Sequence, residues 1–441
     1  MKILYVSHYF PPEMGAPAGR VAGLARAWAA AGHEVHVLTG FPHHPTGRIP
    51  PAYRRAFRRG LLREEDHGVH VHRTWIYPAA NRGKIRRSLN YSSFMASAAV
   101  VGSLCLPRPD VIVATSPQLL CAAAGRLLAR RFRAPLVMEV RDLWPESLIA
   151  VGASRSRSPL VGVLEWLATA LYRSAAHIVT VTDAQRAAIV AGGVPSERVT
   201  VVPNGVDRAF LETGAAAHCA TGCPKESQQD ERFVITYIGT IGMAHHLETL
   251  LEAAAHLRQD SRFVFRLVGE GARRQALEAQ ARAAGLSNVE FCGEQPRGDV
   301  PRWIGQSSAC AVLLRRDEVF RTVVPSKILE IMAVGRPILL GVQGEASALV
   351  ARAGAGVLLE PENPVQLVAA IRSLAQNPAL CRSMGENGRR FVAREFVREA
   401  LAERYATLLA GLVADRRGST APVFATAQNP RPALPSAEEP G

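Results

Sequence analysis

Three polar side chains in the second half of the chain have the types and spacing of an anion-binding site. Ser326, Lys327 and Glu330 follow Pro325, a residue that suits the first position of a helix. Spacings of three and four place them on roughly one face of that helix. A lysine in a first helical turn opposes the helix dipole, so it is best tolerated beside a bound anion. Lys327 is one of four lysines among 52 basic residues, which indicates a required point charge; a solvent-exposed lysine is the alternative.

A glycine loop earlier in the same half could hold the phosphates of such an anion. Gly239, Thr240 and Gly242 come directly after a predicted strand, 233–238, and before a helical pattern. Glycines at this place let the backbone approach a ligand closely, and the following helix presents unpaired N–H groups, so the loop suits a diphosphate. The first half repeats the device at Gly15, where a tight strand-to-helix turn is an equal explanation.

A second glycine loop leaves another chemistry open. Gly269, Glu270 and Gly271 follow a predicted strand and could begin the G-x-G-x-x-G fingerprint of dinucleotide-binding proteins. Arg274 occupies the third glycine position, whereas Glu290 stands about 20 residues further on, where such proteins carry a ribose-binding acid. Glu270 is therefore a candidate for nucleotide contact, and an NAD(P)-dependent oxidoreductase is an alternative function.

In the first half, a charged segment follows the predicted strand 136–139. Charges at the end of a buried strand must be satisfied by a ligand or by each other. We favour a catalytic role for Arg141 and Asp142, and an internal ion pair of Arg141 with Asp142 or Glu139 is the alternative. The Asn204-Gly205 turn that ends this half is interpreted mostly as a hinge.

The composition narrows the classes of protein and partner. The chain has 441 residues, 48% hydrophobic and 20% charged, which is typical of a globular protein with two or three domains. The formal net charge of +14 favours an anionic partner. Seven cysteines are scattered without C-x-x-C, so neither a disulfide framework nor a metal site is predicted. The sequence opens on a strand and has no apolar stretch of spanning length, which predicts a cytosolic protein.

The elements that must position these residues alternate between strand and helix. This alternation predicts parallel sheets with helices on both faces. It pauses at 211–232, a linker rich in Ala, Gly, Gln and charge, and then restarts. We predict an α/β fold with two doubly wound, Rossmann-like domains, 1–210 and 233–395, facing a cleft. A C-terminal helix over 396–414 and a disordered tail over 415–441 follow.

Basic runs lie in the first domain, and apolar residues accompany two of them. The runs contain Arg54, Arg55, Arg58, Arg59 and Arg63, then Arg82, Lys84, Arg86 and Arg87, then Arg126, Arg130, Arg131 and Arg133. We interpret them as a surface that rests on anionic lipid headgroups. Nucleic acid is disfavoured because the expected stacking aromatics and recognition motifs are absent, and a plainly solvated face is the other alternative.

Together these motifs resemble those of the retaining GT-B glycosyltransferases of family 4. The resemblance runs from Met1 to about Ala414, and is greatest for bacterial transferases that build O-antigen, capsule or exopolysaccharide, including the N-acetyl-L-fucosamine transferase type. The segments that carry it are Tyr9-Phe10-Pro11-Pro12-Glu13-Met14-Gly15-Ala16-Pro17, Pro42 with Pro45-Thr46-Gly47, Arg141-Asp142-Leu143-Trp144-Pro145-Glu146, Asn204-Gly205-Val206-Asp207, Gly239-Thr240-x-Gly242, and Pro325-Ser326-Lys327 leading to Glu330.

The resemblance implies that the second domain binds a UDP- or GDP-linked sugar and the first domain faces the acceptor. By the family pattern, Glu330 binds the ribose hydroxyls. The pattern's first glutamate, eight positions earlier, is Thr322 here, and its basic pair near the first glycine loop has no firm match. We therefore expect Arg321 and Lys327 to neutralise the diphosphate, with Lys327 also acting in catalysis by stabilising the leaving group.

The resulting hypothesis is a glycosyltransferase of hexosyl or amino sugars, with retention and without metal or cofactor. The acceptor would be a lipid-diphosphate-linked saccharide of a bacterial surface polysaccharide. D-x-D is absent from the sequence, in agreement with metal independence. The resemblance implies front-face attack, in which the leaving phosphate helps to deprotonate the acceptor, and Asp142 or His177 could assist. We expect the enzyme on the inner face of the cytoplasmic membrane; a nonenzymatic lipid- or saccharide-binding protein is a further alternative.

Overall fold

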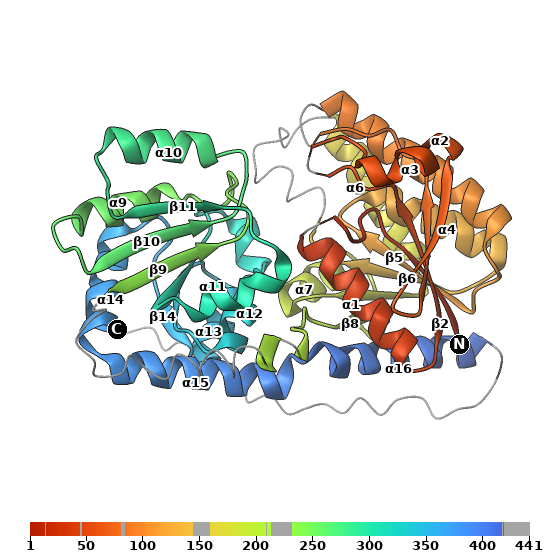
Figure 1. The fold of residues 1–441 in the computed structure, drawn as a ribbon. Coiled ribbons are helices and arrows are strands. Elements are labelled where there is room, and N and C mark those ends of the chain that lie inside the picture. The colour runs from red at the N-terminus through yellow and green to blue at the C-terminus, as the bar shows by residue number, and fades with distance from the viewer. Residues whose placement is uncertain are drawn as a thin grey trace.

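Two α/β domains lie side by side in the computed structural model (Figure 1). The structure describes residues 1–13, 15–44, 46–80, 84–143, 159–208, 210–212, 232–416 and 418. These ranges leave out most of the predicted linker and tail. They also leave out Arg82 and Trp144 to Glu146 of the family motif. Both sheets are parallel apart from one edge pair, with helices on both faces, so the predicted fold class is confirmed.

The N-terminal sheet has eight strands in the order β3-β4-β2-β1-β5-β6-β7-β8. They are β1 (Lys2–Val6), β2 (Glu34–Gly40), β3 (Leu61–Asp66), β4 (Val69–Thr74), β5 (Val111–Ser116), β6 (Leu136–Val140), β7 (His177–Thr180) and β8 (Val199–Val201). Strand β3 was not predicted. It pairs antiparallel with β4 at the sheet edge. Four of its six residues are charged, so it lacks the alternation of apolar and polar residues by which strands are recognised.

Two helical layers cover this sheet. One contains α3 (Lys84–Cys105), α4 (Leu119–Phe132), α6 (Pro159–Ser174) and α7 (Asp183–Ala191), whose buried apolar residues share one core cluster. The other contains α1 (Ala16–Ala30). The short segments η1 (Pro51–Tyr53), α2 (Arg54–Arg59) and η2 (Ser196–Arg198) lie in the connections.

The C-terminal sheet has six parallel strands in the order β11-β10-β9-β12-β13-β14. They are β9 (Phe233–Ile238), β10 (Phe263–Val268), β11 (Val289–Gly293), β12 (Ala309–Leu313), β13 (Ile338–Gly341) and β14 (Gly356–Leu358). Helices α9 (Glu248–His256), α10 (Arg274–Ala283) and α14 (Pro364–Gln376) cover one face. Segments on the other are α11 (Val300–Gly305), α12 (Lys327–Val334), α13 (Glu345–Ala353) and α15 (Pro378–Glu395), with η3 (Arg297–Asp299) and η4 (Glu318–Thr322) in its connections.

The last helix returns to the first domain. Helix α16 (Arg398–Arg416) continues the line of α15 along both domains and packs against α1 (Figure 1). Leu401, Tyr405 and Leu409 are fully or almost fully buried in the same core cluster as the α1 side chains. The Trp28 indole N–H donates to the Ala402 carbonyl at 2.9 Å. A helix was predicted here, but the domain on which it packs was not.

The Asn204-Gly205 turn lies where the chain leaves the first domain and where it later returns. Val206 forms a parallel bridge with Val397. Arg398 donates from Nη2 to the Gly205 carbonyl at 2.9 Å, and its Nε lies 2.5 Å from Asp207 Oδ1. A side chain at Gly205 would meet the Arg398 backbone at 2.9 Å, so this close crossing of two chain segments requires glycine.

Candidate functional site

Lys327 opens helix α12 beneath the first glycine loop. The helix begins at Lys327 with Ser326 as its N-cap, so the prediction that Pro325 takes the first helical position was two residues early. The Ile328 amide bonds to the Pro325 carbonyl at 3.0 Å, a tight turn that precedes the regular helical bonds. Ser326 therefore flanks the helix, and Lys327 and Glu330 lie in its first turn.

The structure brings Lys327 and the glycine loop into contact. Lys327 Nζ donates to the Tyr237 hydroxyl at 3.0 Å and lies 4.0 Å from the centre of its ring. The same hydroxyl donates to the Thr240 carbonyl at 2.6 Å. Gly239 has φ 129°, and a β-carbon there would lie 2.8 Å from Lys327 Nζ. Glycine at 239 thus leaves room for the lysine side chain. Tyr237, whose hydroxyl links the lysine to the loop, was not predicted from the sequence as part of the site.

The charge of Lys327 is poorly compensated. Burial lowers the pKa of its ammonium group to about 7, and Glu330 opposes that shift. Within the described ranges, no carboxylate forms an ion pair with Lys327. His245 lies beside Tyr237, with ring centres 5.7 Å apart, and burial and Lys327 together lower its pKa to about 3. The surroundings therefore favour a bound anion that would stabilise the charged lysine.

Glu330 has the partner that its apolar neighbours require. Arg297 Nη2 donates to Glu330 Oε1 at 2.6 Å, and the guanidinium lies 4.8 Å from the centre of the Phe210 ring. The Glu330 side chain is 12% exposed. Arg297 lies 33 positions earlier, in the short segment η3 and outside any motif, so the sequence offered no signal for this pair.

Arg321 and Thr322 lie in a different environment from Lys327. Arg321 is exposed and pairs with Glu318 on its own turn at 3.1 Å, and no described contact joins it to Lys327. The Thr322 hydroxyl donates to the Val319 carbonyl at 2.9 Å. Its own carbonyl accepts from the Thr182 hydroxyl of the first domain at 3.0 Å. The position of the missing glutamate therefore lies where the domains touch.

The second glycine loop has a structural explanation. A β-carbon at Gly269 would lie 1.9 Å from the Gly239 carbonyl oxygen, and one at Gly271 would lie 2.2 Å from that of Ile241. The two loops are joined by backbone hydrogen bonds, including Ile241 N to Glu270 O at 2.8 Å. Close packing of two backbones thus accounts for the glycines that suggested a dinucleotide fingerprint.

The carboxylates of that segment have arginine partners. Glu270 pairs with Arg274, and it is 47% exposed. Glu290 pairs with Arg266 at 3.0 Å. Gly242 lies in the first loop, where a β-carbon would make only ordinary contacts with Thr240 and His245. No contact in the described structure singles out Glu270 as a nucleotide ligand.

Asp142 lies beyond the carboxyl end of β6. Burial raises the pKa of its carboxyl group to about 6, while Arg141 opposes the shift. Arg141 donates to the Ser116 carbonyl at 3.1 Å, and Gln185 holds the Arg141 carbonyl at 2.8 Å. These bonds fix the segment that carries Asp142, and Gln185 was not anticipated. A carboxyl group that titrates near neutrality is suited to proton transfer.

The alternative of an internal pair with Glu139 is wrong. Glu139 is fully buried, lies 3.1 Å from Arg20 Nε and accepts from the Tyr5 hydroxyl at 2.9 Å. Arg20 in turn donates to the Val202 carbonyl at 2.9 Å. Glu139 therefore joins β1, α1 and the end of the last strand inside the domain, because a buried carboxylate needs both a cation and hydrogen bonds.

His177 lies at the opposite edge of the sheet from Asp142. It begins β7, opposite Val137 near the start of β6, and bonds to the Thr200 hydroxyl at 2.9 Å. Burial and Arg198 lower its pKa to about 4. The expectation that His177 could assist catalysis is wrong, because the amino edge of a parallel sheet faces away from the carboxyl edge.

Residues beyond the carboxyl ends of both sheets touch one another. Thr182 follows β7 and bonds to Thr322, as described above. Glu345 Oε1, at the start of α13, accepts from the Ala184 amide at 2.7 Å in the first turn of α7. These contacts place the edge that carries Asp142 against the domain that carries Lys327.

The loop that carries Gly15 is fixed by a buried carboxylate. Glu13 Oε1 accepts from the backbone amides of His43 and His44, each at 3.0 Å, and burial raises its pKa. Gly15 is exposed at the N-cap of α1 with φ 131°. Sequence reasoning included Glu13 in the family motif without giving it this role.

Several buried polar atoms near the carboxyl ends of the strands in the N-terminal sheet have no hydrogen-bond partner among the described residues. They are His8 Nδ1, Glu13 Oε2, Thr74 Oγ1, Ser116 Oγ and Gln118 Oε1. Each such atom costs about 1–3 kcal/mol unless a partner reaches it. These atoms lie beneath the surface of this edge, so they do not by themselves identify a ligand.

Metal and membrane features can be stated for the described ranges. Those residues contain no cluster of three or more His, Cys, Asp or Glu side chains arranged to hold a metal ion. Among the helices of the same ranges, none combines the length and the apolar character needed to cross a bilayer.

Two family models match consecutive parts of the chain. Residues 15–205 match the glycosyl transferase 4-like domain, and residues 224–391 match the glycosyl transferases group 1. Glycosyl transferase WcaI of Escherichia coli K12, named for colanic acid biosynthesis, is 29% identical over 90% of this chain and 99% of its own length. The 2-deoxystreptamine glucosyltransferase of Streptomyces kanamyceticus is 26% identical over 63% of this chain and 71% of its own.

Solved structures share the arrangement of the two domains. Sucrose-phosphate synthase from Thermosynechococcus elongatus has a TM-score of 0.73 at 20% identity, covering 94% of this chain and 99% of that one. Anabaena HepE in complex with UDP-glucose has a TM-score of 0.66 at 17% identity, with 93% and 100% covered. WaaG, involved in lipopolysaccharide biosynthesis, has a TM-score of 0.64 at 17% identity, with the same coverage.

Proposed function

The chain belongs to the GT-B glycosyltransferases, and we propose that it moves a sugar from a nucleotide diphosphate to a lipid-linked saccharide of a bacterial surface polysaccharide. The observation that carries the donor assignment is Lys327, a half-buried cation beside a glycine loop. It forms no ion pair with a carboxylate in the described structure. The solved complexes of HepE with UDP and UDP-glucose support a UDP-linked donor. Similarity to WcaI supports a polysaccharide pathway.

Lys327 and the start of α12 would stabilise the leaving diphosphate. Negative charge grows on the phosphate oxygens as the bond to the sugar breaks, and a fixed cation at a helix N-terminus lowers the energy of that transition state. Glu330, oriented by Arg297, would accept hydrogen bonds from the ribose hydroxyls through its remaining lone pairs. The reaction then needs no metal ion.

The acceptor would bind at the carboxyl edge of the first domain. This edge carries Asp142 and faces the domain that carries Lys327, so an acceptor bound there would lie between the two. Asp142 would take the proton from the attacking hydroxyl directly or through the leaving phosphate. We propose retention of configuration, with attack from the face that the diphosphate leaves.

A lipid-linked acceptor requires contact with a membrane, and the helical layer around α3 and α4 fits an anionic bilayer. Helices α3 and α4 contain no acidic residue, and α6 contains one. Large apolar side chains are exposed on them, namely Ile85, Leu89, Val100, Leu104, Leu127, Val163 and Trp166. Arginines that flank an exposed apolar surface suit the headgroup region of a membrane.

Some apolar residues that accompany the basic runs are packed inside the domain and are not exposed to a membrane. Phe57 and Leu62, which accompany the first basic run, pack against the core cluster of the domain, and Phe94 is fully buried. These side chains anchor α2, β3 and α3 to the sheet. Arg54, Arg55, Arg58 and Arg59 themselves are exposed, whereas the side chain of Lys84 lies outside the described atoms.

The proposal is tested by incubating the protein with a panel of UDP- and GDP-sugars and measuring the nucleotide released. One donor class should be cleaved, faster when a lipid-diphosphate saccharide is added. Glu330→Gln should weaken binding of both UDP and uridine. Lys327→Ala should weaken binding of UDP more than binding of uridine, with a loss for UDP of about 1.5–3 kcal/mol. Calorimetry that shows unchanged UDP affinity in both variants would remove the donor assignment.

A further inference from the structure

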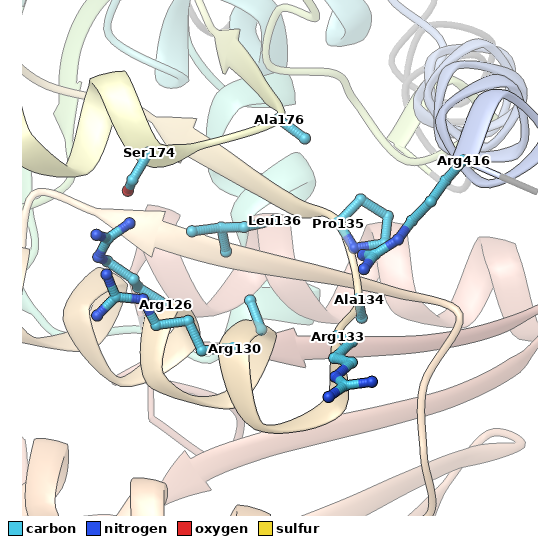
Figure 2. A pocket seen from close by; sticks show the side chains of 10 residues that line it. Arg126, Arg130, Arg133, Ala134, Pro135, Leu136, Ser174, Ala176 and Arg416 are labelled. Atoms are coloured by element: carbon cyan, nitrogen blue, oxygen red, sulfur yellow. The ribbon is translucent and has the colours of Figure 1, made fainter.

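A cationic hollow lies at the amino edge of the N-terminal sheet, opposite the edge that carries Asp142. It has a volume of about 380 Å³ and is lined by Arg126, Arg130 and Arg133 around the end of α4, and by Arg416 from α16 (Figure 2). Leu136 begins β6 at this place, so the hollow is at the start of that strand whereas Asp142 follows its end.

The arginines of this hollow have no acidic counterpart in the part of the chain that the structure describes. None of the four takes part in an ion pair there. Arg126 and Arg130 are four positions apart on one helix face, and burial together with the charge of Arg130 lowers the pKa of Arg126. Four like charges repel each other until an anion enters, so the hollow is electrostatically incomplete.

The remaining lining does not offer competing donors. The Ala134 amide bonds to Ala129 O at 3.0 Å, and the Ala176 amide bonds to Leu136 O at 2.8 Å. The Ser174 hydroxyl donates to Leu171 O at 2.8 Å. Guanidinium groups are therefore the free donors, above a surface formed by alanine, proline and leucine side chains. Paired N–H groups of arginine match the oxygens of a phosphate better than single donors do.

The dipole of α4 explains only part of this cluster. Arg130 and Arg131 lie in the last helical turn, where cations favourably face the helix C-terminus. Arg126 lies more than a turn earlier, and Arg416 comes from the other end of the chain and extends toward Pro135 (Figure 2). The presence of both side chains in the lining of one hollow needs a further reason.

We propose that this hollow binds a phosphate group carried on an organic body, at a site separate from the donor site. Its cationic rim would hold the phosphate oxygens, and its apolar surface would contact the rest of the ligand. Such a ligand would also link α4 to α16. The phosphate could belong to a lipid headgroup or to a soluble phosphorylated compound, and the site does not depend on the proposed donor or acceptor.

Calorimetry with inorganic pyrophosphate tests the site. The full-length protein would carry Lys327→Ala, which weakens binding at the donor site. Pyrophosphate should still bind this protein, and adding Arg126→Gln or Arg416→Gln should weaken that binding at least about tenfold. Arg131→Gln is the matched control, because Arg131 is exposed on the same helix and does not line the hollow. Equal loss in all three variants, or no loss in any, overturns the proposal.

Two further probes identify the source of the phosphate. Glucose 1-phosphate represents soluble compounds, and phosphatidylcholine vesicles with or without phosphatidylglycerol represent the membrane. Binding that Arg416→Gln reduces and Arg131→Gln preserves should appear with one of these probes, which names the source. If neither probe distinguishes Arg416→Gln from Arg131→Gln, the arginines act only as diffuse positive charge and the site is rejected.

Discussion

The protonation of Lys327 links its burial to ligand binding. A pKa of about 7 means that the free protein loses this charge across neutral pH, whereas a bound diphosphate favours the ammonium form and raises the pKa. Proton uptake must then accompany binding above pH 7. Arg297 and Glu330 differ in this respect, because they already neutralise each other.

We predict that affinity for UDP-glucose falls as pH rises from 7 to 9, by up to about tenfold per unit. UDP-glucose is a suitable probe because its diphosphate is already fully ionised. Lys327→Arg should bind more weakly but with little dependence on pH, because arginine stays charged. Calorimetry at pH 7, 8 and 9 measures both. The same slope in wild type and Lys327→Arg would mean that another group titrates.

Asp142 should control turnover and leave donor affinity unchanged. We predict that Asp142→Asn lowers kcat by about 100- to 10,000-fold, the range of general base catalysis, while the Kd for UDP-glucose stays the same. The base must be ionised, so wild-type kcat should rise with pH through about 6. A donor affinity that collapses in Asp142→Asn, with the fold intact, would assign Asp142 to the other substrate.

Candidate site residues were easier to predict from the sequence than the residues that contact them. Lys327 and Glu330 could be singled out because their spacing and the unusual lysine are visible in one segment, and Gly239 because it stands directly between a strand and a helix. Arg297 could not, because 33 residues separate it from Glu330 and only tertiary packing brings them together. Tyr237 was hidden for a related reason, since it reads as an ordinary strand residue until its hydroxyl meets Lys327.

At the scale of elements, strands were predicted well where both faces are buried. The strand Phe233–Ile238 has the predicted bounds, because its apolar run ends directly at Gly239. The edge strand Leu61–Asp66 was missed because one side is exposed and charged. A strand at the edge of a sheet is less buried, so its sequence contains fewer of the apolar residues from which strands are predicted.

The packing of the two glycine loops makes Gly269 a sensitive position. We predict that Gly269→Ala displaces the Gly239 loop from Lys327, because the new β-carbon would lie 1.9 Å from the Gly239 oxygen. UDP-glucose affinity should drop at least about tenfold, with stability reduced by more than about 1 kcal/mol. Gly298→Ala is the control, since among the described residues none beyond its two chain neighbours has an atom within 4 Å of its β-carbon position. Normal affinity in Gly269→Ala would show that the loops can separate freely.

The arginines of α2 are predicted to contribute to membrane binding. Each cation near an anionic surface adds about 1 kcal/mol, reduced by salt. Replacing Arg54, Arg55, Arg58 and Arg59 with Gln should reduce sedimentation with phosphatidylglycerol vesicles and leave UDP-glucose affinity unchanged. High salt should release the wild type. Equal sedimentation of the two proteins would remove α2 from the contact, and binding that resists salt would point to insertion of exposed residues such as Trp166.

At the scale of the whole molecule, the domains are joined by contacts of two kinds. Thr182 and Ala184 meet the C-terminal domain through single hydrogen bonds, which a small rotation can break. Helix α16 instead shares a buried apolar core with α1. The first kind permits relative motion of the domains at the carboxyl edges, and the second fixes the N-terminal domain to the end of the chain.

Shortening a core side chain of α16 should therefore destabilise the N-terminal domain. We predict that Leu409→Ala, at a fully buried position, costs about 2–5 kcal/mol and lowers the melting temperature. Arg404→Ala, exposed on the same helix, should have little effect. Calorimetric scanning compares the two variants. An unchanged transition in Leu409→Ala would mean that α16 contributes no stability to that domain.

The position of α16 also sets an order of events during translation. The strands of the N-terminal domain are complete at Val201, yet the partners of Trp28 lie about 200 residues later. At roughly 5–20 residues per second, a ribosome needs about 10–40 seconds to synthesise that interval. Throughout it, the α1 surface of the nascent domain is uncovered while the second domain is still being made. Chaperones that shield apolar surface would thus meet this chain at α1, and their release would coincide with the arrival of its last helix.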